Sequence, residues 1–190
     1  MSTTTLFQGN YNRIPSGLAK FGIGDWEMRY GNHRAVVQVT QEADAVCAYL
    51  PWRRRDSHPE TKHVLVVDGQ TGEVVSNSVV VSCNREYGEV VFQPVSGAGT
   101  YYLYYLVPVE DENAFKWPRW AFPITQYLPP QHTASEEWLT RHGLSLDQRK
   151  SIPLIESPNQ TAPYPAAWRD LPLAELVEFQ ARSAWDSFYP

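Results

Sequence analysis

The sequence predicts an all-β protein, an antiparallel β-sandwich of the immunoglobulin or jelly-roll kind, from three observations. Short segments rich in valine and aromatic residues recur through residues 35–107, with turn-forming residues between them at intervals of about 8–12 residues. No helical pattern of about 10–15 residues separates these segments, which argues against a parallel α/β sheet. Of the 190 residues, 43% are hydrophobic and 13% are aromatic, so the chain can bury a substantial core.

Each expected strand follows from its own pattern. Alternating apolar and polar side chains predict a strand at 35–41, and apolar or β-branched runs predict the others. Glycines that tolerate a positive φ favour turns at 69–72 and 96–99, and two further glycines favour a turn within 21–26. The expected strands are 35–41, 44–50, 63–68, 76–83, 87–94 and 100–108.

The last expected strand has no polar face. In an extended chain, alternate residues point to opposite sides of the sheet. One side receives Tyr101, Leu103, Tyr105 and Val107, and the other receives Tyr102, Tyr104 and Leu106. A strand of this composition is covered on both sides. We therefore expect one side in the sandwich core and the other against a further layer, a partner domain or a flat ligand.

Residues 1–110 are expected to form the sandwich, and residues 111–190 an extension rich in aromatics and proline, with one or two short helices. The prolines of 114–131 exclude a regular helix or a central strand, so an extended arm is expected there. A short helix is predicted at 133–143, with Thr133 as its cap and Gly143 at its end. Residues 174–182 fit either a helix or a strand. The extension is expected to pack on the sandwich or to link it to another domain.

Charge and composition exclude several classes of protein. A net charge of −5 and a pI near 5.5 argue against a nucleic-acid or anionic-membrane binder. No apolar run reaches the roughly 18 residues that a membrane span needs. The first residues lack the basic and apolar regions of a signal peptide, which favours the cytoplasm, or secretion if the sequence is trimmed. Cys47 and Cys83 lie in apolar runs, and whether they pair is left open.

The residues that commonly carry catalysis or bind metals form no recognisable site. Glycosidases need two carboxyl groups about 5–10 Å apart. Glu86 and Glu89 flank a tyrosine-glycine turn or bulge, where exposure is the simpler expectation. His58 and His63 are the only close histidines, and the proline after His58 disfavours a zinc-binding helix. We therefore assign no catalytic residue, metal site or cofactor.

A run of arginines after an apolar strand is the clearest candidate for a ligand site. In an extended chain, Arg53 and Arg55 point one way, whereas Trp52 and Arg54 point the other. The arginines could hold a carboxylate or a sulfate beside an indole ring that stacks on a sugar. Alternatively, the run is a loop whose charges are solvated or paired locally with Asp56 and Glu60.

Four segments, YGNHRAVVQV, LPWRRRD, NREYGEVVFQP and AGTYYLYYLVP, together resemble the N-terminal β-sandwich of glycoside hydrolase family 123-like proteins. The resemblance spans roughly residues 9–110, and more loosely the following segment up to EFQARSAWDSFYP. In that family the sandwich precedes a (β/α) barrel, and the characterised members are hexosaminidases that act on N-acetylgalactosamine with an Asp-Glu pair and substrate assistance. The pair belongs to the barrel, so no catalytic residue carries over. The resemblance favours a connecting strand at 174–182.

These inferences predict a non-catalytic, carbohydrate-associated module that is accessory to a glycoside hydrolase. Its expected partners are a carbohydrate or a glycosidase catalytic domain. Two alternatives stay open: a glycoside hydrolase in its own right, and an assembly protein, including a homo-oligomer, whose aromatics and arginines form an interface. The residues expected to bind a ligand are Trp52, Arg53, Arg54, Arg55, Tyr87, Trp117 and Trp120.

Overall fold

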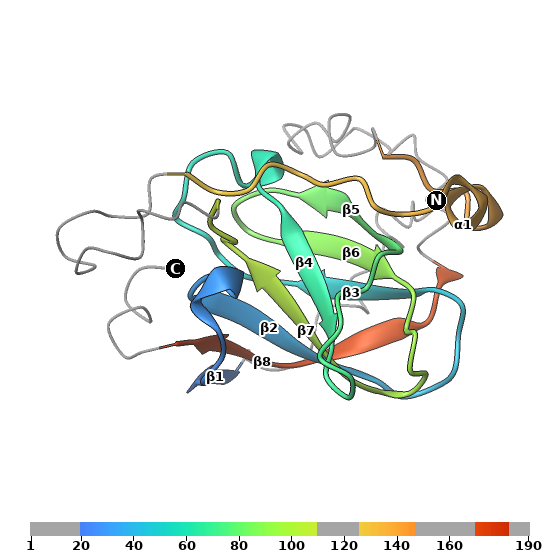
Figure 1. Cartoon of the computed structure of the whole chain (residues 1–190), viewed down its shortest axis with the longest axis horizontal. Helices are drawn as coiled ribbons and strands as arrows, with labels where there is room; N and C mark the ends of the chain where they lie inside the picture. Colours follow the sequence, from blue (N-terminus) through green and yellow to red (C-terminus); the bar gives the residue numbers. More distant parts are fainter. Residues whose placement is uncertain (1–19, 110–125, 147–169, 183–190) are drawn as a thin grey trace, which may run out of the picture.

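The computed structural model describes residues 20–109, 126–146 and 170–182, and it confirms the all-β prediction. In these ranges, eight strands form a curved sheet that folds over on itself into a sandwich that is nearly a barrel (Figure 1). One short helix, α1 (Glu136–Arg141), lies at its edge. Trp117, Trp120 and most of the arm at 114–131 lie outside the described residues.

The expected strands are all present close to their predicted bounds. The strands are β1 (Lys20–Ile23), β2 (His33–Val39), β3 (Val46–Leu50), β4 (Val64–Asp68), β5 (Ser78–Cys83), β6 (Gly88–Phe92), β7 (Gly99–Tyr105) and β8 (Leu173–Ala181). Their order across the sheet is β4-β7-β2-β8-β3-β6-β5, and β1 also pairs with β8. The prediction of a turn within 21–26 is wrong for residues 21–23, because they belong to β1, which pairs with β8.

Strand β8 comes from beyond residue 110 and lies in the middle of the sheet, which confirms the preference for a strand there. It runs antiparallel to β2 but parallel to β3 and β1, so the sheet is mixed and not wholly antiparallel as predicted. A bulge at Val177 shifts the register with β2. Because of this bulge, Leu176 and Phe179 both pack on the sandwich core, which strict alternation does not allow.

The sandwich core lies between the layer β4-β7-β2 and the layer β5-β6-β3, which cross in Figure 1. The first side of β7 points into it: Tyr101, Leu103 and Tyr105 are each at most 1% exposed. Valines of β2, β4 and β6 surround these side chains. The alternating and β-branched patterns that predicted the strands therefore supply the core as well.

The other side of β7 is covered by the chain itself, which confirms the prediction that both sides are buried. The sides predicted for Leu106 and Val107 are wrong, because Leu106 has a φ of +113° and breaks the alternation: Leu106 packs in the sandwich core, and Val107 packs with Tyr104. The 3-10 turn Met28–Tyr30 brings the ring of Tyr30 to 4.9 Å from that of Tyr104. The guanidinium of Arg34 lies 4.4 Å from the ring of Trp26 and 4.0 Å from that of Tyr102. Arg34 also donates a 3.0 Å hydrogen bond to the Tyr104 hydroxyl.

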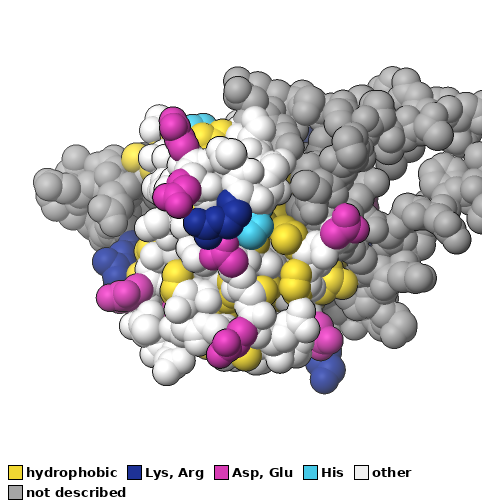
Figure 2. Space-filling model, turned by 90° about the vertical axis from the view of Figure 1, so that its right-hand side faces the viewer, with side chains coloured by type: hydrophobic (Ala, Val, Ile, Leu, Met, Phe, Trp, Pro, Cys, Tyr) yellow, Lys and Arg dark blue, Asp and Glu magenta, His cyan; other side chains and the backbone are white. Residues whose placement is uncertain are grey.

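Helix α1 covers the outer face of β3, β5 and β6, where buried Trp138 and Leu139 contact Cys47 and three valines. The helix is confirmed, but Ser135 rather than Thr133 caps it, since Ser135 accepts from Trp138 N at 3.3 Å. Asp44 holds the helix end, because it accepts hydrogen bonds from Arg141 and His142 at 2.7 Å each. Figure 2 shows this end of the molecule, where acidic side chains are spread among the other types.

Cys47 and Cys83 form no disulfide with each other. Cys47 lies in the cluster under α1, whereas Cys83 packs against the sandwich core. The two side chains therefore lie on opposite faces of their layer.

Candidate functional site

Two loops meet at one end of the sandwich and bring together most of the residues that the sequence singled out. We call residues 52–58 the arginine loop and residues 84–87 the Asn84 turn. Backbone hydrogen bonds join them, from Arg53 N to the Glu86 carbonyl at 3.2 Å and from Arg54 N to the Arg85 carbonyl at 2.6 Å. Tyr87 and the run Trp52–Arg55, distant in sequence, are therefore neighbours.

Both loops are held in one shape by local interactions. The Asn84 side chain accepts from the backbone N–H groups of Glu86 at 2.8 Å and Tyr87 at 2.9 Å, which closes the turn. The Trp52 indole donates to the Asn84 carbonyl at 2.9 Å. Arg53 has a φ of +47°, a backbone conformation that is uncommon for a residue with a side chain. The surrounding contacts therefore fix a conformation that the loop alone would disfavour.

Trp52 anchors the arginine loop in the protein. It is only 5% exposed, and its ring lies 5.4 Å from that of Tyr105. The ring packs so closely on Gly88 that a Cβ atom there would approach it to 2.3 Å. With its faces covered by protein, the indole is placed as a structural anchor and not as a platform open to solvent.

Arg54 is also internal, because its side chain is 0% exposed. Its Nε and Nη2 atoms donate to the two carboxylate oxygens of Asp56, both at 2.8 Å. Lys62 pairs with the same carboxylate and donates to the Ser57 carbonyl at 2.7 Å. The local pairing with Asp56 that the sequence left open is thus present, and Arg54, Asp56 and Lys62 form what we call the ion cluster.

Burial and the two cations set the charge of the Asp56 carboxyl in this cluster. Burial alone would raise the pKa of Asp56, but Arg54 and Lys62 outweigh it and hold that pKa below its ordinary value of 3.8. Burial raises the pKa of Tyr105 far above its ordinary value of 10.0, so this hydroxyl stays neutral. One carboxylate therefore lies between two cations. The cluster ties the arginine loop to the protein interior.

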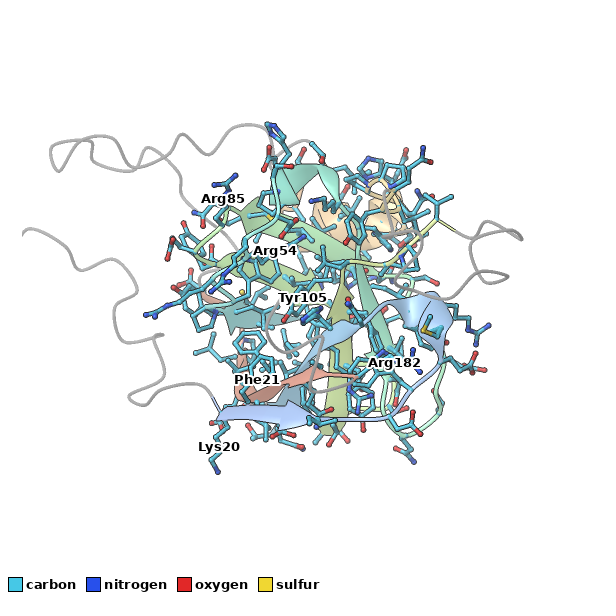
Figure 3. All side chains as sticks on the ribbon, turned by 90° about the vertical axis from the view of Figure 1, so that its left-hand side faces the viewer. Lys20, Phe21, Arg54, Arg85, Tyr105 and Arg182 are labelled. Carbon is cyan, nitrogen blue, oxygen red and sulfur yellow. The ribbon has the colours of Figure 1, made fainter. Side chains whose placement is uncertain are left out.

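The neighbouring arginines point outward. Arg53 and Arg55 are exposed while Trp52 and Arg54 are buried, which confirms the predicted alternation. Arg85, on the Asn84 turn, is exposed too. Figure 3 shows it at the rim, with Arg54 and Tyr105 farther in. Within the described ranges, no carboxylate pairs with the side chains of these three exposed arginines.

A pair of stacked tyrosines lies beside these arginines. The rings of Tyr49 and Tyr87 are 5.5 Å apart and inclined by 25°, and both residues are half-buried. Tyr49 stands opposite Glu89 in the pairing of β3 with β6. Burial, followed by the neighbouring Tyr87 and Glu89, raises the pKa of Tyr49. The pair offers a flat, partly exposed aromatic surface whose hydroxyls can hydrogen-bond.

Sequence reasoning missed Tyr49 and Arg85. Tyr49 was read only as part of a strand, and its partner Tyr87 lies on a turn that the sequence does not connect to it. The signal for Arg85 was its position in the same turn as Tyr87. Tyr49 could not be assigned without the pairing of β3 with β6, nor Arg85 without the backbone hydrogen bonds between the two loops.

The described residues favour no catalytic or metal-binding arrangement. Glu86 is exposed on the turn as expected, but the exposure expected of Glu89 is wrong, because it is 9% exposed on β6. No group of three or more His, Cys, Asp or Glu side chains in these ranges is placed to hold a metal ion. Likewise, no helix among the described residues is long and apolar enough to cross a bilayer.

Fold and site together define a class of protein: a β-sandwich domain with an aromatic and arginine-rich end, placed on two loops. The family described as Glycoside hydrolase 123, N-terminal domain, matches residues 24–182, and this chain belongs to that family. The match confirms the resemblance seen in the sequence and makes this a glycoside hydrolase-associated domain. Comparisons with curated proteins and with solved structures give no match.

Proposed function

We infer that this domain is a non-catalytic, carbohydrate-associated module that is accessory to a glycoside hydrolase. The observation that carries the proposal is the stacked Tyr49–Tyr87 pair, half-exposed beside the outward arginines of a chain in a glycoside hydrolase-associated family. Aromatic rings cover the apolar faces of sugars, and nearby polar groups fix their orientation.

The stiffness of the two loops supports a binding role. A surface loop that only connects strands needs neither a buried ion cluster nor a residue with positive φ. Here the buried Arg54 of the ion cluster stands between the exposed Arg53 and Arg55, and Arg53 is itself the residue with positive φ. A surface fixed before it meets its ligand loses less conformational entropy on binding.

The test is titration of the whole chain with a panel of oligosaccharides, followed by isothermal calorimetry. Binding should be saturable in the millimolar range or tighter. Tyr87→Ala should weaken it about tenfold, since it removes one stacked ring. Tyr87→Phe, which keeps the ring, is the matched control and should retain most of the affinity. The proposal fails if no oligosaccharide binds, or if Tyr87→Ala binds as well as the unaltered chain.

A second candidate role, an assembly interface, is favoured by a different part of the molecule. Phe21 and Ile23 on β1 are 50% and 63% exposed, which is unusual for large apolar side chains on one short strand. Sedimentation of the unaltered chain and of an Ile23→Lys variant tests this role. A dimer that the substitution dissociates supports it, and a monomer at high concentration opposes it.

A third reading, a glycoside hydrolase in its own right, is tested by turnover of chromogenic glycosides. It requires activity that disappears in Glu86→Gln or Glu89→Gln.

A further inference from the structure

In the described part of this acidic chain, the exposed cations without a carboxylate partner are unevenly distributed. Of the ten Lys and Arg side chains in the described ranges, four pair with a carboxylate: Arg29 with Glu27, Arg54 and Lys62 with Asp56, and Arg141 with Asp44. Arg53, Arg55 and Arg85 are exposed and have no such carboxylate partner among the described residues. All three lie on the arginine loop and the Asn84 turn, and one further exposed cation of the described ranges without a carboxylate partner, Lys20, lies on β1.

The protein brings these three charges together at a cost. Two loops joined by backbone hydrogen bonds place the three residues on neighbouring segments of backbone, although like charges repel. The two loops carry four arginines but only two carboxylates, Asp56 and Glu86, and the ion cluster already occupies Asp56. Glu86 is exposed next to Arg85 and offsets part of this charge. The excess is positive on a chain whose net charge is −5.

We propose that this end of the domain binds an acidic saccharide, with Arg53, Arg55 and Arg85 holding its anionic groups and the Tyr49–Tyr87 pair covering a sugar ring. This inference rests on the proposed function and names its ligand class. A guanidinium presents a planar fork of donors that matches either a carboxylate or a sulfate, so uronic acids and sulfated sugars share the required chemistry. Neutral sugars would leave the three charges unused.

Arg54 supports this surface from beneath without contacting the ligand. It is buried and engaged with Asp56, so it positions the backbone that carries Arg53 and Arg55. The three outward arginines bind the ligand, whereas Arg54, which the sequence predicted as a ligand-binding residue, holds the loop in place.

The experiment compares matched ligands by calorimetry with the whole chain at low ionic strength. The probes are an oligogalacturonate and its methyl ester, and a sulfated galactan oligosaccharide and its desulfated form. The two anionic probes distinguish carboxylate from sulfate, and each neutral form has the same sugar backbone. Inorganic sulfate is the fifth probe and shows whether the anion alone is enough.

We expect at least one anionic probe to bind tenfold or more tightly than its neutral form. Raising the salt from about 20 mM to about 300 mM should weaken that binding, since the charges are exposed. Arg55→Ala and Arg85→Ala should each raise the Kd about five- to tenfold. The control is Lys20→Ala, which removes an equal charge from the opposite edge of the molecule (Figure 3) and should leave the Kd unchanged.

The outcomes separate this inference from the proposed function. If neutral and anionic forms bind equally and the arginine variants behave like the unaltered chain, the ligand class is wrong while carbohydrate binding stands. If Lys20→Ala weakens binding as much as Arg55→Ala does, the attraction is non-specific and the site is refuted. If inorganic sulfate binds as tightly as the sulfated oligosaccharide, or no saccharide binds, both proposals fall.

Discussion

Replacing the buried Arg54 by methionine should destabilise the fold without exposing a new apolar surface. Methionine keeps most of the apolar volume between Trp52 and Tyr105 but removes the charge. The substitution loses two charge-assisted hydrogen bonds to Asp56, each 2.8 Å long. It also loses the contact of the guanidinium with the Trp52 ring at 4.8 Å.

The magnitude follows from these losses. Two charge-assisted bonds contribute about 1.5–3 kcal/mol each when their groups are buried, and the cation–ring contact adds about 0.5–1 kcal/mol. Asp56 keeps Lys62 as a partner and is 14% exposed at its side chain, which reduces the loss. Removing Arg54 also removes the Nη1 donor, which is buried and has no hydrogen-bond partner among the residues that the structure describes. We therefore expect the free energy of unfolding to fall by about 3 kcal/mol at neutral pH.

Urea denaturation measures this loss, with Arg55→Met as the control. Arg55 is the exposed neighbour, and its replacement should change the free energy of unfolding by no more than about 0.5 kcal/mol. Asp56→Asn and the double variant complete a cycle in which the two losses should be less than additive by about 1–2 kcal/mol. If Arg54→Met unfolds at the same urea concentration as the unaltered chain, the ion cluster does not stabilise this loop.

The same cluster predicts an acid dependence. The folded-state pKa of Asp56 lies below its unfolded value near 3.8. The stabilisation of the fold by the ionised Asp56 carboxylate is therefore complete above that pH and is lost as the pH falls further. Arg54→Met should consequently lose less stability than the unaltered chain between about pH 4 and pH 2. Gly88→Ala should lower the free energy of unfolding by about 1–3 kcal/mol, since its Cβ would collide with the Trp52 ring, and calorimetric melting would show whether it does. Asp44→Asn should weaken the attachment of α1, because the carboxylate that accepts from Arg141 and His142 is lost. The loss should be only about 1 kcal/mol, since the Asp44 side chain is over a third exposed. Hydrogen exchange of the helix should become faster while that of β2 stays unchanged.

The strands were predictable because their signals are local. Valine-rich alternation between 35 and 94, and the two-sided apolar strand at 100–108, need only the chain's own geometry to be recognised. The covering of both sides of β7 also followed from composition, since no arrangement leaves such a strand in water. That Arg53 and Arg55 point away from Trp52 and Arg54 also followed from local geometry, but which of the two sides is buried did not.

The candidate site needed the tertiary structure. Tyr49 meets Tyr87 only because β3 pairs with β6, strands that are not consecutive in the chain. Arg54 was predicted as a ligand residue because the sequence shows its charge but not its burial. Its partner Asp56 lies only two residues away, but the contact of Asp56 with Lys62 could not be predicted from the sequence. Arg85 lies near Arg53 and Arg55 because backbone hydrogen bonds join the Asn84 turn to the arginine loop.

By itself, therefore, the sequence determined that this chain forms a β-sandwich and which faces of its strands are buried. Those properties depend on residues one to four positions apart. The tertiary structure alone decided which arginines face solvent, which one is neutralised inside, and that β8 completes the middle of the sheet. These features depend on contacts between segments that are distant in the sequence. A local sequence pattern shows neither which segments meet nor which charges are removed from water.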